Sequence, residues 1–206
     1  MTTIGLISDV HADPGPVEEA LALFADQHVS EVFCLGDIAG YNESLTETIS
    51  LLKKHSVQSI YGNHDLKYLK KQEVDSEQAA YLKQLPAFIS KKIDGKQLYF
   101  VHAQPPDICH GGIKLLNKQG EIQQNMLAEW EKKIAPYNYD VLVVGHTHQV
   151  FVERMGSTLV INPGSTVFNH CCAILSLPDL NVELFSLSGN NIVNTWNWSD
   201  HVIYKK

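Results

Sequence analysis

Short apolar runs, each too brief for a helix, alternate with helix-like segments along the first third of the chain. The runs at 4–8, 31–35 and 57–61 are expected to be buried strands. Between them, apolar residues recur at helical spacing over 16–24 and 45–52. This β-α-β-α-β order is the strongest constraint on the fold, because it favours a sheet with helices packed against it.

The second half of the chain is richer in predicted strands than in helices. Asp94-Gly95 lies between two strand-like runs and predicts a β-hairpin. The helical stretch before this hairpin is expected to end at Pro86. The elements expected in this half are, in chain order, a helix over 66–85, hairpin strands at 88–93 and 97–102, a loop over 103–119 and a helix over 121–134. Five further strands are expected at 141–144, 150–154, 158–162, 172–177 and 182–187.

No linker rich in proline, serine or glycine separates the two halves, so we expect a single domain over residues 1–206. The order of elements predicts an α/β fold, a four-layer α/β/β/α sandwich of two mixed β-sheets flanked by helices. Trp196 and Trp198 alternate in the Asn-rich tail and are expected to pack at an edge.

The composition is that of a globular protein with an ordinary core, and it excludes several functions. The 206 residues are 44% hydrophobic and 19% charged, and the formal net charge is −7. Because phosphate neutralisation needs a basic surplus, this balance argues against general nucleic-acid binding, though not against a small phosphorylated substrate. We expect no membrane helix and no leader peptide. The four cysteines have neither disulfide nor zinc spacing, which favours a reducing cytoplasm.

Residues of the metal-ligand type follow the predicted strands, at the points where those strands end. In Asp9-Val10-His11 and His146-Thr147-His148, the i, i+2 spacing on extended chain points the outer side chains the same way. One such pair alone is weak support, but open α/β sheets build their sites at the carboxyl ends of strands. The residues found at these ends are Asp9, His11, Asp37, Asn63, His64, His102, His146 and His148. Together they predict a metal site.

Five ordered sequence blocks carry these residues, namely Asp9-x-His11, Gly36-Asp37, Gly62-Asn63-His64-Asp65, His102 and Gly145-His146-x-His148. In this order the blocks resemble those of the calcineurin-like metallophosphoesterases. Asn162-Pro163-Gly164-Ser165 is similar to the NPGS loop of the small single-domain bacterial phosphodiesterase branch. The resemblance spans residues 4–165 and implies the metallophosphoesterase sandwich.

The resemblance also implies two divalent metal ions. The ligands implied for the first metal are Asp9, His11 and His148, and those for the second are Asn63, His102 and His146. Asp37 matches the carboxylate that bridges the two metals. Mixed nitrogen and oxygen ligands suit Mn²⁺, Fe, Zn²⁺, Co²⁺ or Ni²⁺ better than Ca²⁺ or Mg²⁺, and Mn²⁺ is our first expectation.

The chemistry that the resemblance implies is the hydrolysis of a phosphoester. Water held between two metals becomes hydroxide near neutral pH and attacks phosphorus in line. His64 matches the histidine that approaches the substrate phosphate without binding metal, where it stabilises charge or protonates the leaving oxygen. Asn63 and His64 are the expected substrate contacts. We therefore expect a metal-dependent phosphoric ester hydrolase, a phosphodiesterase in preference to a phosphomonoesterase.

One block departs from the protein-phosphatase branch of the superfamily. There the Gly-Asp block continues to an Asp that orients the catalytic histidine and an Arg that holds phosphate. Here it continues as Ile38-Ala39-Gly40-Tyr41, so no motif assigns a partner to His64. Gly40-Tyr41 is instead similar to the GDxxGY variant of small bacterial members, and a protein phosphatase is not expected.

Two other functions stay open. A nucleotide-directed hydrolase, acting on dinucleoside polyphosphates or cyclic nucleotides, would need basic residues near the site. Arg154 is the only arginine, and the lysines at 67, 70 and 71 are more typical of a solvated helix face. A non-catalytic interaction scaffold of the same fold is disfavoured because His64 accompanies every ligand block.

His110 lies in the loop 103–119, which is placed to cover the pocket.

Overall fold

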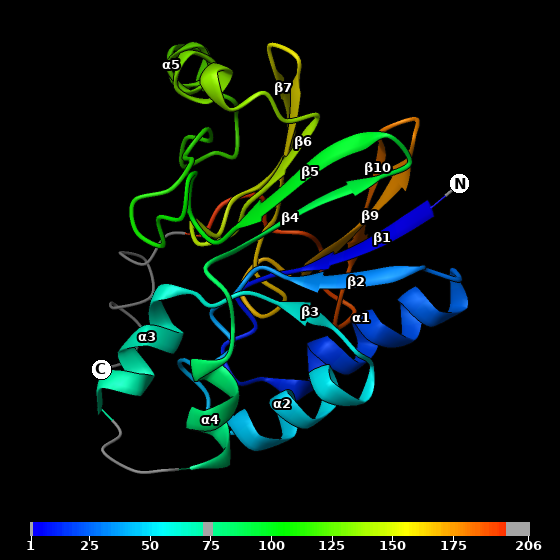
Figure 1. Ribbon diagram of the computed structural model, residues 1–206, viewed down its shortest axis with the longest axis vertical. Helices are drawn as coiled ribbons and strands as arrows, with labels where there is room; N and C mark the ends of the chain where they lie inside the picture. Colours follow the sequence, from blue (N-terminus) through cyan, green and yellow to red (C-terminus); the bar gives the residue numbers. More distant parts are fainter. Residues whose placement is uncertain (1, 72–75, 197–206) are drawn as a thin grey trace.

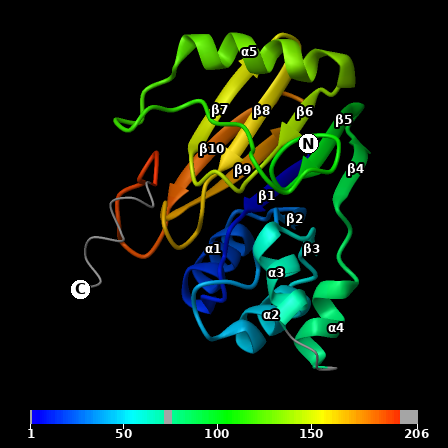
Figure 2. The ribbon, with the colours of Figure 1, turned by 90° about the vertical axis from the view of Figure 1, so that its left-hand side faces the viewer.

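Helices lie on the outer faces of two β-sheets that pack against each other, so the layers run α/β/β/α (Figures 1 and 2). The computed structural model describes residues 2–71 and 76–196. The layer order confirms the predicted fold class. Every helix within those two ranges is too short or too polar to span a membrane.

The first sheet has five strands in the order β10-β9-β1-β2-β3. Strands β1, β2 and β3 are parallel, whereas β9 runs antiparallel to both β1 and β10. The strand bounds are Thr2–Ile7 for β1, Glu31–Cys34 for β2, Gln58–Ser59 for β3, Cys171–Leu177 for β9 and Asn181–Ser186 for β10. The parallel strands therefore end at one edge of the sheet, where their following loops meet.

The second sheet also has five strands, in the order β4-β5-β6-β8-β7. Its three central strands are parallel, and the two edge strands are antiparallel to their neighbours. The bounds are Phe88–Ile93 for β4, Lys96–Val101 for β5, Val141–Val143 for β6, Val150–Met155 for β7 and Thr158–Pro163 for β8. The predicted hairpin at Asp94-Gly95 is confirmed.

The helices divide unequally between the two outer faces (Figure 2). Helices α1 (Pro14–Asp26), α2 (Leu45–Lys54), α3 (Asn63–Lys71) and α4 (Glu77–Lys83) lie on the side of the first sheet, and α5 (Gln124–Ile134) covers the second. A short 3₁₀ turn at Ala135–Tyr137 follows α5. The buried face of α1 is made of the four apolar residues that the helical spacing predicted, Val17, Ala20, Leu21 and Phe24.

Apolar side chains from both sheets form the layer between them. Phe33 of β2 and Phe100 of β5 stack with ring centroids 4.1 Å apart, and both are at most 1% exposed. Burying a phenylalanine contributes roughly 1.5–3 kcal/mol, so this layer fixes one sheet against the other. The loops at the strand ends are thereby held in register across the two sheets.

Two expectations about the elements need correction. The single helix expected over 66–85 is two helices, because Ser76 begins a new one by accepting a hydrogen bond from the backbone N–H of Ala79 at 3.1 Å. The strand expected at 57–61 pairs over two residues only. Residues 72–75 and Trp198 lie outside the described residues, and the single domain over 1–206 stays a prediction.

Candidate metal centre

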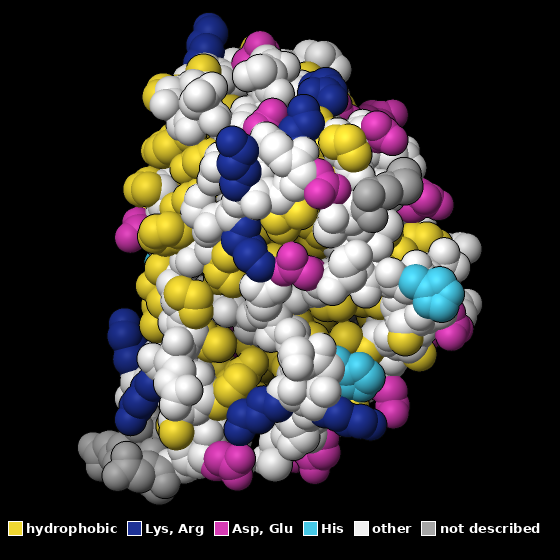
Figure 3. All heavy atoms as spheres, turned by 45° about the vertical axis from the view of Figure 1, so that its right-hand side comes forward, with side chains coloured by type: hydrophobic (Ala, Val, Ile, Leu, Met, Phe, Trp, Pro, Cys, Tyr) yellow, Lys and Arg dark blue, Asp and Glu magenta, His cyan; other side chains and the backbone are white. Residues whose placement is uncertain are grey.

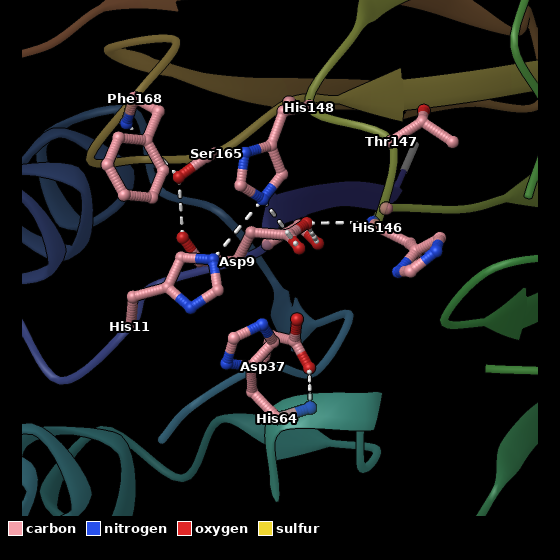
Figure 4. Close-up of polar contacts among 12 residues, drawn as sticks. Asp9, His11, Asp37, His64, His146, Thr147, His148, Ser165 and Phe168 are labelled. Carbon is pink, nitrogen blue, oxygen red and sulfur yellow. Dashed lines mark hydrogen bonds and ion pairs between the residues drawn. The ribbon is translucent and has the colours of Figure 1, made fainter. Parts of the chain in front are cut away.

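The loops that follow β1, β2, β5 and β6 bring the predicted ligand residues into two neighbouring groups. Figure 4 shows the first group, and Asp37 and His146 of the second. In each group, one nitrogen or oxygen atom per residue lies within 4.8 Å of the others. The groups consist of Asp9, His11 and His148, and of Asp37, His102 and His146. They adjoin each other, since the backbone N–H of His146 donates to Oδ2 of Asp9 at 2.9 Å.

The first group points three ligand atoms at one another. Nε2 of His11 lies 3.2 Å from Nε2 of His148, which in turn lies 3.3 Å from Oδ1 of Asp9. The other carboxylate oxygen of Asp9 accepts from Ser8 Oγ at 2.5 Å, whereas the buried Oδ1 accepts no hydrogen bond from any described residue. Buried acceptors are normally satisfied, so an oxygen in this position fits a ligand of a metal cation.

The ligand atoms of the second group also face one another, and the side-chain oxygen of Asn63 lies among them. Nε2 of His102 lies 3.4 Å from Oδ1 of Asp37 and 3.1 Å from Oδ1 of Asn63. Oδ1 of Asn63 is also 2.9 Å from Nδ1 of His146. On its far side, Nδ1 of His102 donates to the carbonyl of Leu35 at 2.6 Å, which leaves Nε2 to face the group.

The spacings in both groups fit metal binding. Ligand atoms bound to one ion at ~2.0–2.2 Å lie about 3.0–3.5 Å apart in octahedral or tetrahedral geometry. The observed separations between facing ligand atoms run from 2.9 to 3.4 Å. The side chains of each group therefore lie close enough together to bind one ion.

Burial sets the charge of two of the histidines. It lowers the pKa of His11 and of His146, in each case to about 4, so both imidazoles are neutral near pH 7. Burial alone would lower the pKa of His102 as well, but the adjacent Asp37 carboxylate raises it to about 9. The Asp37 carboxylate thus favours a positive charge at this position, whether a proton on His102 or a metal cation that replaces it.

The two carboxylates stay ionised despite their burial. Burial alone would raise the pKa of Asp9 and of Asp37, both at most 2% exposed. His148 instead holds the pKa of Asp9 below its ordinary value, and His102 does the same for Asp37. Two buried anions beside the neutral imidazoles of His11 and His146 offer the mixed oxygen and nitrogen ligands that divalent transition metals prefer.

The backbone at the site is strained. Five of the predicted ligands have φ between 44° and 65°, the left-handed region that non-glycine residues rarely adopt. They are Asp9, His11, Asp37, His146 and His148. Each such residue costs of order 1–3 kcal/mol, and this strain is retained where it serves a function.

Two glycines allow the loops to approach each other closely. A Cβ atom on Gly62 would lie 2.1 Å from Oδ1 of Asp37, and one on Gly145 would lie 2.0 Å from Oγ of Ser8. No side chain fits at either position without moving a ligand loop. The glycines of the Gly-Asn-His-Asp and Gly-His-x-His blocks therefore serve the geometry of the site.

The Asn162–Ser165 loop supports the ligand loops from behind. The fully buried amide of Asn162 donates to the carbonyl of Gly145 at 3.1 Å, and the Ser165 hydroxyl donates to the carbonyl of Asp9 at 2.6 Å. Asn169, which the sequence did not single out, donates to the carbonyl of His148 at 2.9 Å. These bonds hold the positive-φ segments in place.

His64 lies at the edge of the site and belongs to neither ligand group. Its backbone N–H donates to Oδ1 of Asp37 at 2.7 Å, and its ring centroid is 5.1 Å from that of His11. Tyr41 is the partner that no motif assigned, with its hydroxyl oxygen 3.0 Å from Nε2 of His64. The only sequence signal for this contact was the GDxxGY pattern.

Asp65 joins two of the loops around the site. Its fully buried carboxylate accepts from the N–H of Gly62 at 2.8 Å, near the start of α3, and also from Ala39 at 2.7 Å. Burial raises the pKa of Asp65 to about 7. The side chain thereby ties the loop after β2 to the loop after β3.

The predicted loop 103–119 contains no helix or extended strand and lies beside the second group. The ring of His110 is 6.5 Å from that of His146, but His110 is not a member of either ligand group. Trp196, expected at an edge, follows Thr195, which bridges Gln149 just before the edge strand β7. Its ring stacks on Phe168 at 5.0 Å, and Phe168 stacks on His148 at 5.2 Å.

Known proteins share both the sequence pattern and the fold. The chain matches the family model of the calcineurin-like phosphoesterase superfamily domain over residues 2–177. An uncharacterized protein of Methanocaldococcus jannaschii, MJ0912, is 27% identical over 78% of this chain and 68% of its own length. Phosphodiesterase MJ0936 of the same organism is 25% identical over 84% of this chain and 86% of its own length.

A solved structure adds independent support for the fold. The hypothetical protein PH1004 from Pyrococcus horikoshii superposes with a TM-score of 0.72 at 18% identity, covering 94% of this chain and 89% of that one. The family match covers most of the chain and includes every ligand loop. The chain therefore belongs to the calcineurin-like phosphoesterase superfamily and is a metal-dependent phosphoester hydrolase.

Proposed function

We propose that the protein is a phosphodiesterase with two divalent metal ions. The first would be held by Asp9, His11 and His148, and the second by Asn63, His102 and His146. Asp37 would lie between them as the shared carboxylate. The observation that carries the proposal is the clustering of the ligand atoms within 4.8 Å of one another in each group, with a buried Oδ1 of Asp9 that accepts no hydrogen bond from the described residues. The relative named as a phosphodiesterase, 25% identical, supports a diester substrate.

The residues around the ions would have different roles in the reaction. When bound, the two ions supply an acidified water and clamp the phosphoryl oxygens. His64, half-buried at the edge of the site, is placed to contact the substrate phosphate and to protonate the leaving oxygen. Tyr41 holds the imidazole through Nε2, in the place of the Asp found in the protein-phosphatase branch. Asn63 would contact the substrate from the second metal.

The partner that fits this site is a small phosphorylated molecule. On the face drawn in Figure 3, basic and acidic side chains are interspersed, and the formal net charge is −7. Strong binding to nucleic acid needs a basic surplus. All four cysteines are free thiols, so we also propose a reducing, cytoplasmic location.

Elemental analysis of protein purified without added metal, followed by a panel of aryl phosphate mono- and diesters, tests the proposal. We expect two metal equivalents per chain, with Mn²⁺ as the preferred ion in reconstitution, and faster cleavage of diesters than of monoesters. Cleavage of monoesters alone would overturn the diester assignment. Failure to bind metal or to cleave either ester under Mn²⁺ supplementation would favour the non-catalytic scaffold.

A further inference from the structure

A groove with a volume of about 550 Å³ opens directly beside the second ligand group. Its lining includes His146, Thr147, Lys114, Lys118 and Trp196, and we call it the Lys114 groove. His146 is both a predicted metal ligand and part of the groove lining. A phosphoryl group bound at the metal centre would therefore place one of its substituents at the mouth of this groove. What the groove holds therefore bears on the identity of the substrate.

The loop that carries the two lysines is fixed to the ligand loop by a buried glutamine. Oε1 of Gln149, which follows His148 in sequence, accepts from the N–H of Leu115 at 2.8 Å and of Leu116 at 3.0 Å. Its Nε2 donates to the carbonyl of Leu116 at 3.0 Å. The backbone directly after Lys114 is thus fixed relative to the metal centre.

Thr147 adds a further attachment between the same two loops. Its hydroxyl donates to the carbonyl of Ile113 at 3.1 Å and accepts from the amide of Asn162 at 3.0 Å. At the other end, Oδ1 of Asn117 accepts from the N–H groups of Gln119 and Glu121, both at 2.9 Å, which shapes the turn around Lys118. The lysine positions are therefore built into the site.

The charge in the groove is not neutralised within the described chain. Lys114 and Lys118 are exposed, and across residues 2–71 and 76–196 no carboxylate lies within 4.0 Å of either ammonium group. In a chain with a net charge of −7, two such lysines beside a metal centre form a local anion site. The lysine ammonium is a common ligand of phosphate.

We propose that the Lys114 groove binds a second phosphate, carried by one of the two organic groups of the substrate diester. This inference rests on the proposed phosphodiesterase function and narrows its substrate class to diesters with a phosphorylated substituent. Lys114 and Lys118 supply the positive charge, and the Gln149 contacts hold them beside His146. Neither lysine takes part in bond breaking, so the effect belongs to substrate binding.

Two chromogenic substrates that differ by one phosphate test this subsite. They are thymidine 5′-(p-nitrophenyl phosphate) and the same compound with a 3′-phosphate, which share the leaving group and the optical assay. Because exposed charge pairs are individually weak, the two lysines together predict a preference of about tenfold in kcat/KM for the 3′-phosphorylated compound. The double variant Lys114→Gln/Lys118→Gln should lose this preference through KM while retaining kcat/KM on the simpler diester.

A matched control removes the same charge elsewhere. Lys54 and Lys92 are exposed lysines on α2 and β4, and Lys54→Gln/Lys92→Gln should keep the full preference. Equal kcat/KM for the two substrates in the unmodified protein would overturn the proposal. So would an equal loss on both substrates in the Lys114/Lys118 variant, or an equal loss of preference in the control.

Calorimetry separates failure of the subsite from failure of the proposed function. Thymidine 3′,5′-bisphosphate should bind the Mn²⁺-loaded protein about tenfold more tightly than thymidine 5′-monophosphate, and the Lys114/Lys118 variant should abolish this difference. If neither chromogenic diester is cleaved, the phosphodiesterase function is wrong, and the binding difference still decides the subsite. Equal affinities for the two nucleotides would rule the subsite out.

Discussion

The hydroxyl oxygen of Tyr41 lies 3.0 Å from Nε2 of His64, and the ring of Tyr41 stands edge-on to His11 with centroids 4.7 Å apart. One aromatic side chain thereby touches both a predicted metal ligand and the predicted catalytic histidine. Tyr41 reaches them from the loop after β2, directly behind Gly40, whose backbone passes close to the ring of His11. The loop that replaces the protein-phosphatase continuation thus supplies its own partner for His64.

Removing the Tyr41 hydroxyl should slow the reaction without disturbing the fold. A hydrogen bond contributes about 0.5–1.5 kcal/mol net, so Tyr41→Phe should lower kcat roughly three- to tenfold with a smaller change in KM. Because Tyr41 is 49% exposed, Tm and metal content should stay unchanged. Tyr68→Phe, in the same groove beside His64, is the matched control and should retain normal kcat. A fall in metal content in Tyr41→Phe would make the residue a structural support instead.

The shared carboxylate gives a second prediction. Asp37→Asn keeps the shape of the side chain but removes the charge that would serve both ions, so metal content and turnover should fall together. Plasma emission analysis and diester hydrolysis on the same preparation measure both quantities. Two tightly bound ions with near-normal turnover in Asp37→Asn would show that Asp37 does not bridge the ions.

The strand ends and the clustering of polar residues at them were predictable because both signals are local. Apolar runs ending in Asp9 or His146 mark a buried strand and the loop after it, and i, i+2 spacing needs no tertiary information. The amphipathic face of α1 was likewise readable, since Val17 to Phe24 follow the helical period. For these features the sequence and the fold agree residue by residue.

The contacts that complete the site were not predictable in the same way. Tyr41 meets His64 across 23 positions, and Gln149 meets Leu116 across 33, so neither contact has a local pattern. The break between α3 and α4 depends on the cap at Ser76, which competes with an otherwise continuous helical pattern. The two long-range contacts form only after the strands of each sheet have paired and brought their loops together.

The glycine of the Gly-Asn-His-Asp block should be intolerant of any side chain. In Gly62→Ala, the added methyl group would meet Oδ1 and the backbone nitrogen of Asp37 at 2.1 and 2.5 Å. We expect a displaced ligand loop, loss of bound metal and a lower Tm.

Gly95→Ala is the control, because that hairpin glycine has φ of +79° but nothing within 4 Å of the added atom. It should cost about 1–3 kcal/mol of stability and leave metal content intact. Full metal content in Gly62→Ala would contradict the close packing seen at this point.

The cysteines should differ sharply in reactivity. Cys34, Cys171 and Cys172 are buried, and burial raises the pKa of each thiol, to about 12 for Cys171. Cys109, in the loop 103–119, is partly exposed. Native protein treated with iodoacetamide should therefore gain one adduct by intact mass, mapped to Cys109, whereas denatured protein should gain four. Early modification of a strand cysteine in native protein would contradict the packing of the first sheet.

The last prediction separates chemistry from metal binding at His64. The side chain belongs to neither ligand group, so His64→Ala should retain its metal ions. General acid catalysis typically contributes ~10²–10⁴-fold, and kcat should fall by about that factor. A p-nitrophenolate leaves readily as an anion, whereas an alkoxide needs a proton, so the variant should lose less on aryl diesters than on alkyl diesters. Equal losses on both would mean that His64 stabilises charge on the phosphoryl oxygens instead of protonating the leaving group. Loss of an ion in His64→Ala would make it a ligand and exclude both roles.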